Sequence, residues 1–137
     1  MYYEPIGTDM EENKRKVLII DDDENIREYV KCMLEDEGFE VFVADNGRTG
    51  IDIFTRESID LIITDLIMPE KEGIETIQDI RKIDKNCGII AMSGVSNKDS
   101  YLSISSLLGA HAILHKPFKP QELMSVINEI FDRNTTE

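Results

Sequence analysis

The chain has 137 residues, enough for one domain with its own hydrophobic core. Its composition, 41% hydrophobic and 31% charged, is typical of a globular protein, and no apolar run approaches the ~20 residues of a membrane span. The formal net charge of −13 argues against direct binding to nucleic acid or to an anionic membrane surface, because phosphate binding requires a basic face. We therefore expect a partner with a basic docking surface, or a divalent cation.

The beginning of the chain and its cysteines favour a cytoplasmic protein. Residues 1–15 are acidic and lack apolar periodicity, which predicts a flexible N-terminal extension. They also lack the basic-then-apolar layout of a secretory signal. Cys32 and Cys87 form neither a disulfide framework nor a metal cluster.

Five short apolar runs alternate with stretches of helical periodicity along the chain. The apolar runs, which predict buried strands, are 17–20, 40–45, 59–64, 88–93 and 111–115. Each is followed by a helical stretch, at 26–34, 51–54, 73–80, about 97–108 and 120–131. This alternation predicts one doubly wound α/β domain over 16–133, with a five-stranded parallel sheet, helices on both faces and a polar tail over 134–137.

Local signals set the limits of several of these helices. One of the aspartates in Asp21-Asp22-Asp23 should cap the first helix, and Gly38 should end it. Pro120 suits the first turn of the last helix. The serine-rich stretch 97–108 has weak apolar periodicity, which predicts a marginally stable, movable helix; a solvated helix that never moves is the alternative.

Four of the five predicted strands end in a chemically capable side chain. Asp21 and Asp22 follow the first strand, Asp65 ends the third, Ser93 ends the fourth and Lys116 follows the fifth. Parallel strands place all these ends at the same edge of the sheet, so we expect the side chains to converge there. Each residue alone could simply cap a helix or close a turn. Their joint occurrence at strand ends favours a functional site.

Three neighbouring carboxylates repel one another and need a compensating cation. Mg²⁺ suits such a cluster because it binds few protein oxygens and keeps waters or phosphate oxygens in its octahedron. Lys116 supplies a further positive charge, and Ser93 supplies a hydrogen-bond donor for an anion. A carboxylate such as Asp65, with a metal on one side and a lysine on the other, is equipped to attack a phosphoryl group.

With these motifs the chain resembles the receiver domain of two-component response regulators, over roughly residues 16–132. The matching segments are Asp21-Asp22, Asp65, Met68-Pro69 with Gly73, Ser93-Gly94, Gly109-Ala110 and Lys116-Pro117-Phe118. The resemblance implies a flavodoxin-like sheet with the strand order 2-1-3-4-5. It also implies a signalling phosphoprotein rather than an enzyme that turns over other substrates.

The resemblance further implies a role for each site residue. Asp65 would accept a phosphoryl group from the phosphohistidine of a histidine kinase or a histidine phosphotransfer protein. Asp22, Asp65 and the backbone carbonyl of Ile67 would bind Mg²⁺, or Mn²⁺ in its place. Asp21 would act mainly through a metal-bound water.

On the opposite side of the phosphoryl group, Ser93 would donate a hydrogen bond to its oxygens and Lys116 would pair with them. Phosphorylation adds about −1.5 to −2 charges at one site. It would switch the binding of a downstream protein or of an attached output domain.

Two positions depart from the family pattern. Ile113 lies three residues before Lys116, where family members usually carry an aromatic ring that swings inward on activation. Ring movement therefore cannot be the output signal here. Ile67 is apolar where a polar residue often positions the hydrolytic water, which predicts slow self-dephosphorylation.

Other readings of the site fit less well. A small Mg²⁺-dependent aspartyl phosphatase of the haloacid-dehalogenase type needs a second aspartate two residues after the first, where this chain has Ile67. A flavin carrier needs a phosphate-binding loop after the first strand, where Asp21-Asp22-Asp23 would repel a phosphate. Within the receiver class, a stand-alone protein and a fragment of a longer regulator are both open, as is a homodimer through the fourth and fifth helices.

Overall fold

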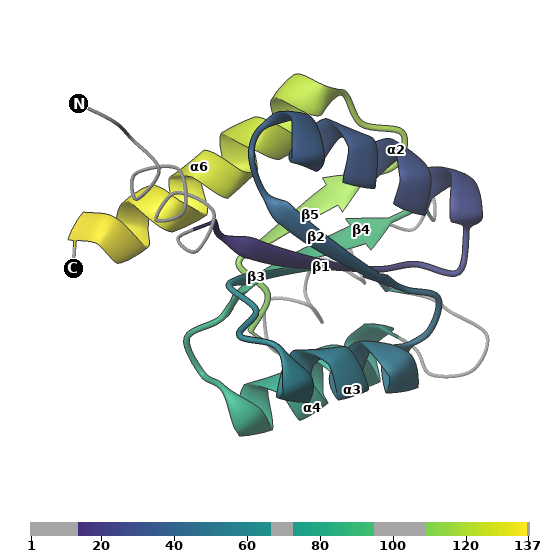
Figure 1. The fold of residues 1–137 in the computed structure, drawn as a ribbon, viewed down its shortest axis with the longest axis vertical. Helices are drawn as coiled ribbons and strands as arrows, with labels where there is room; N and C mark the ends of the chain where they lie inside the picture. The colour runs from purple at the N-terminus through teal and green to yellow at the C-terminus, as the bar shows by residue number, and fades with distance from the viewer. Residues whose placement is uncertain (1–13, 67–72, 95–108, 137) are drawn as a thin grey trace, which may run out of the picture.

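A computed structural model describes residues 14–66, 73–94 and 109–136 (Figure 1). The strands are β1 (Lys16–Ile20), β2 (Glu40–Ala44), β3 (Leu61–Asp65), β4 (Gly88–Ser93) and β5 (Ala112–His115). The helices of the described residues are α2 (Glu24–Asp36), α3 (Gly47–Arg56), α4 (Gly73–Ile83) and α6 (Pro120–Thr136). All strand pairs are parallel, and the order β2-β1-β3-β4-β5 confirms the predicted sheet.

The central strands are mainly apolar because helices cover both faces of the sheet. Figure 1 shows α2 and α6 on one face and α3 and α4 on the other, as predicted. Side chains alternate between the two cores: Ile63 of β3 packs with Val30 and Ile127 on the α2/α6 side, whereas Ile62 packs with Ile77 on the α3/α4 side. Every residue of β3 and β4 is buried.

Capping residues set the helix ends near the sheet. The predicted aspartate cap of α2 is Asp23, whose side chain accepts hydrogen bonds from the backbone N–H groups of Asn25 and Ile26. Gly38 follows this helix with a φ of 96°, a left-handed conformation that favours glycine. Asn46 caps α3 by accepting from the N–H of Thr49.

Several predictions fall at the limits of the described residues. The backbone of α6 continues to Thr136, so this helix includes most of the segment 134–137 that we expected to be a tail; no Gly or Pro interrupts it there. The predicted helix at 97–108 and most of the extension 1–15 lie outside the described residues. Within the described part of the chain, no helix is long and apolar enough to cross a membrane.

Gly73 begins α4 where the chain passes closest to the end of β3. Its N–H donates to the carbonyl of Leu66, with an N···O distance of 2.9 Å. A Cβ atom at this position would overlap the backbone carbonyl of Asp65 and would lie 2.8 Å from the Cα of Leu66. The start of α4 therefore requires a residue without a side chain to sit against the strand end that carries Asp65.

We predict that Gly73→Ala lowers the free energy of unfolding by about 2–3 kcal/mol, because backbone rather than a flexible side chain must move. Gly38→Ala is the matched control: nothing lies within 4 Å of its added Cβ, and only the left-handed backbone opposes it, at about 1 kcal/mol. Urea denaturation of both variants measures the difference. Equal losses would show that the close approach at Gly73 is unimportant.

Candidate functional site

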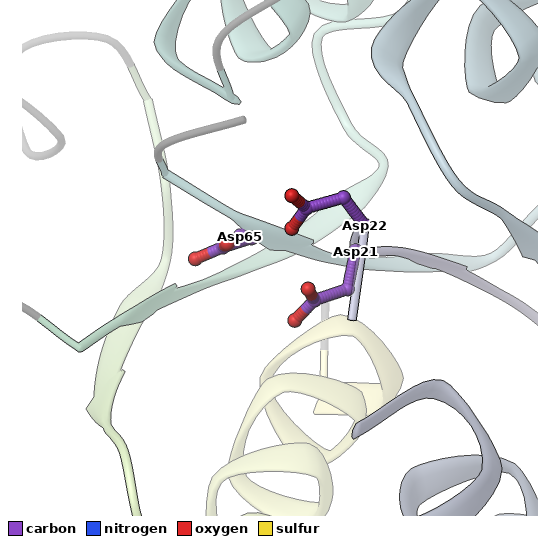
Figure 2. A group of neighbouring side chains, drawn as sticks. All are labelled: Asp21, Asp22 and Asp65. Carbon is purple, nitrogen blue, oxygen red and sulfur yellow. The ribbon is translucent and has the colours of Figure 1, made fainter. Parts of the chain in front are cut away.

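Three carboxylates meet where β1 and β3 end. Asp21 and Asp22 follow β1 directly, and Asp65 is the last residue of β3. The two strands pair in register, with Ile20 opposite Thr64, so their ends lie side by side. One oxygen from each carboxylate lies within 4.8 Å of the others, and Figure 2 shows the three side chains gathered at this edge.

The three acids differ in their exposure to solvent. Asp21 is fully buried and Asp65 is 8% exposed, whereas Asp22 is exposed. Burying a carboxylate is costly unless a cation or hydrogen-bond donors compensate for the lost water. The cluster is therefore open on the side of Asp22 and needs an internal partner on the side of Asp21.

Lys116 is that partner. It follows β5, and its Nζ donates to Asp21 Oδ2 at 2.9 Å and lies 3.4 Å from Asp65 Oδ1. Burial by itself would lower the pKa of Lys116, but the hydrogen bond to Asp21 and the charge of Asp65 outweigh it and raise the pKa. The lysine therefore stays charged between the two buried acids.

The pKa of Asp65 reflects the balance of burial and charge in the cluster. Burial raises the pKa of this carboxyl to about 6, Lys116 opposes the rise, and the charge of Asp21 adds to it. A third negative charge is thus disfavoured in this cluster. A hard divalent cation would reverse that balance, and the donor set of carboxylate oxygens is the one that Mg²⁺ prefers. The residues therefore fit a magnesium site.

The loop that carries the first two acids is held by several hydrogen bonds. The N–H of Asp21 donates to the carbonyl of Ala44 at 3.1 Å, and Asp21 Oδ1 accepts from the N–H of Asp23 at 2.9 Å. Arg27 Nη1 donates to the carbonyl of Asp21 at 2.8 Å. Arg27 was not among the residues predicted from the sequence. Long side chains in a helix point back toward its N-terminus, so a basic residue in the first turns of α2 was an available signal.

Ser93 and Ile113 lie on the neighbouring strands β4 and β5. Ser93, at the end of β4, is 3% exposed, and its Oγ makes no hydrogen bond among the described residues. Its backbone carbonyl accepts from the N–H of Lys116 at 2.8 Å. Ile113 is half-buried against the α3/α4 core. Ile67 lies outside the described residues.

A doubly wound sheet with acids and a lysine at its carboxyl edge is the architecture of a receiver domain. The chain matches the response regulator receiver domain over residues 17–128. This protein belongs to the response regulator receiver family of two-component systems. The predicted family and the predicted fold class are thereby confirmed, and a classical enzyme is not what this family represents.

The similar curated proteins carry the names of transcriptional regulators. The transcriptional regulatory protein CpxR of Escherichia coli K12 is 37% identical over 119 residues, which cover 87% of this chain and 50% of CpxR. The probable transcriptional regulator ycf27 of Cyanidium caldarium is 39% identical over 128 residues, 91% of this chain and 50% of its own length. The chain thus spans about half the length of these relatives.

Several of the similar solved structures are named as receiver domains or response regulators. A CheY-like receiver domain protein from Methanospirillum hungatei superposes with a TM-score of 0.84 at 28% identity, covering 91% of this chain and all of the other. The chemotaxis protein CheY4 of Vibrio cholerae gives 0.80 at 29% identity, covering 85% of this chain and 98% of its own. Both of these proteins align with this chain over nearly their whole length.

The raised pKa of Asp65 predicts a pH-dependent stability in the absence of divalent cations. Its folded value of about 6 exceeds the unfolded value of 3.8, so this group favours the folded state below about pH 4 and loses that contribution as the pH rises through 6. Asp65→Asn should therefore unfold at a higher urea concentration than wild type at neutral pH, and the difference should shrink as the pH falls toward 4. Asp52→Asn, at an exposed position on α3, is the charge-matched control. A difference that does not change with pH would contradict the assignment.

Proposed function

We propose that Asp65 is the phosphoacceptor of a two-component or phosphorelay system. In this proposal a histidine kinase or a histidine phosphotransfer protein delivers the phosphoryl group in a Mg²⁺-dependent reaction. The observation that carries the proposal is the meeting of Asp21, Asp22 and Asp65 with Lys116 at one edge of a receiver-family sheet.

The metal ligands in this proposal are the carboxylates of Asp22 and Asp65 and the backbone carbonyl of Ile67, with Asp21 acting through a metal-bound water. Asp22 supports it because this carboxylate is exposed and can take up a cation from solvent. Asp21 supports an indirect role because Lys116 already occupies one of its oxygens at 2.9 Å. Bound Mg²⁺, or Mn²⁺ in its place, neutralises charge on the transferring group.

The transfer itself requires little covalent chemistry from the protein. An oxygen of Asp65 bonds to phosphorus as the P–N bond of the phosphohistidine breaks, and the bonding pair stays with the imidazole nitrogen. The Nζ of Lys116 is 3.4 Å from Asp65 Oδ1 in the unphosphorylated protein. It is therefore close enough to pair with the oxygens of a phosphoryl group on Asp65. Ser93 donates a hydrogen bond after its side chain has turned toward the site.

The phosphorylated domain then acts by switching a binding equilibrium. The partner in this equilibrium is a downstream protein or an attached output domain. A second copy of the domain, bound through the fourth and fifth predicted helices, is another possible partner. An attached output domain is supported by the relatives, which are named as transcriptional regulators and are about twice as long as this chain. We place the receiver unit at 16–133, between a flexible extension and a tail, with no direct contact between this domain and nucleic acid. We place the protein in the cytoplasm.

Phosphorylation by acetyl phosphate tests the site directly. With Mg²⁺ present, we predict that the intact mass of the wild-type protein rises by one phosphoryl group, and that Asp65→Asn shows no such gain. Asp22→Asn should lower the rate and shift its half-point to a higher Mg²⁺ concentration, because one metal ligand is lost. Asp52→Asn, which removes one charge at an exposed position on α3, should behave as wild type.

An undiminished mass gain in Asp65→Asn would assign the phosphoryl group to another residue. No gain in the wild type, with either acetyl phosphate or a phosphorylated histidine kinase as donor, would refute the phosphoacceptor function. The first outcome would show that the wrong residue was assigned, and the second would show that the proposed function is wrong.

Ile67 predicts a long-lived phosphoryl group, because an apolar side chain cannot orient the attacking water. Ile67→Asn should speed hydrolysis by about tenfold, the effect of one hydrogen bond of roughly 1.4 kcal/mol made in the transition state. Ile67→Val keeps the apolar character and should leave the rate near that of wild type. The decay of the phosphorylated mass after removal of the donor gives each rate. A wild-type lifetime of seconds would rule this explanation out.

A further inference from the structure

Two buried side-chain polar atoms have no hydrogen-bond partner among the described residues: Oγ of Ser93 and Nδ1 of His115. Buried polar atoms in folded proteins almost always have a partner, so each exception calls for an explanation. Here the two exceptions are neighbours. Ser93 is the last residue of β4 and His115 the last residue of β5.

The sheet places these two side chains next to each other. Ser93 and His115 are register partners in the parallel β4–β5 pair. The residues before them, Met92 and Leu114, both pack in the α2/α6 core. Because side chains alternate along a strand, Ser93 and His115 both project toward the opposite, α3/α4 side, where the Cβ atoms of paired residues are about 5 Å apart.

The chemistry of the two atoms is complementary. A neutral imidazole that carries its proton on Nε2 presents a lone pair at Nδ1, and a serine hydroxyl has one proton to donate. The backbones are already tied, since the N–H of Lys116 donates to the carbonyl of Ser93 at 2.8 Å. We expect rotation of the two side chains to join the hydroxyl to the ring.

We infer that Nδ1 of His115 is the resting acceptor of the Ser93 hydroxyl, and that His115 competes with the phosphoryl group on Asp65 for that hydroxyl. The first half of this inference concerns the unphosphorylated protein alone; the second rests on the proposed function. Asp65 lies two residues after Ile63, which packs in the α2/α6 core, and Lys116 contacts Asp65 at 3.4 Å. Because side chains alternate along a strand, Ser93 must leave the α3/α4 side to reach a phosphoryl oxygen on Asp65. One hydroxyl proton cannot serve both acceptors.

This arrangement makes His115 a positioning residue that acts through Ser93. The hydrogen bond to His115 on β5 would favour the resting position of the Ser93 hydroxyl. This is the strand in which Ile113 replaces the usual aromatic ring. Without the imidazole, the hydroxyl would be free to bind the phosphoryl group at no cost. A phosphoryl mimic should then bind more tightly.

Ring ¹⁵N spectra of the metal-free protein test the resting pair. The Nδ1 signal of His115 should shift between wild type and Ser93→Ala, because the substitution removes its donor. His111, the only other histidine, is an internal reference: its Nδ1 already accepts from the N–H of Ile89 at 3.1 Å, and its signal should not move. An unchanged His115 signal would overturn the inference.

Beryllofluoride, a phosphoryl mimic, tests the competition in the presence of Mg²⁺. His115→Phe removes the ring nitrogens but keeps a ring, and should tighten binding about two- to tenfold, the range of one hydrogen bond. His115→Asn places an amide oxygen near the position of Nδ1 and should restore the wild-type affinity. In a Ser93→Ala background, His115→Phe should have no effect.

A tightening by His115→Phe that persists in Ser93→Ala would show that the histidine acts on packing and not on the hydroxyl, and would overturn the competition. The failure of wild type to bind beryllofluoride at all would instead contradict the proposed function of Asp65. In that case the spectra of the metal-free protein would still decide whether Ser93 and His115 pair.

Discussion

The contact of Lys116 with two buried carboxylates is the interaction on which the site depends. Asp21 and Asp65 lose their water on folding, in a chain that already carries a net charge of −13. A single Nζ, 2.9 Å from one and 3.4 Å from the other, supplies the compensating charge. Because the lysine cannot neutralise three acids, the cluster remains short of positive charge. Burial raises the pKa of Asp65, and the charge of Asp21 adds to that rise. The shortage of positive charge accounts for the fit to a divalent cation.

The strand order of the sheet makes the contact of Lys116 with the two acids possible. The order β2-β1-β3-β4-β5 brings residues from the first and last strands to one edge, and the two apolar cores hold the strands in register. Glycine at position 73 lets α4 start directly against the end of β3, while Arg27 and the capping Asp23 hold the loop after β1. The geometry of the acids thus follows from packing well outside the site.

In the function that we propose, a signal leaves this edge of the sheet, and β4 and β5 carry residues suited to transmit it. Ser93 and His115 end these strands as register partners, each with a buried polar atom that the described residues leave unpaired. Ile113, in the same strand, packs into the α3/α4 core and has no polar group to move. Coupling through a hydrogen bond that changes its acceptor is therefore better matched to this chain than coupling through a moving ring.

Much of this protein could be predicted from its sequence, because local patterns were strong. Apolar runs bounded by glycines and acids marked the strands, and the acids, the serine and the lysine at their ends marked the site. The tertiary structure alone decided that the buried Asp21 contacts Lys116, that Arg27 donates a hydrogen bond to the carbonyl of Asp21, and that Ser93 and His115 are register partners in neighbouring strands. These features depend on strand register and on the direction of side chains from distant elements, neither of which is encoded in any short stretch of the chain.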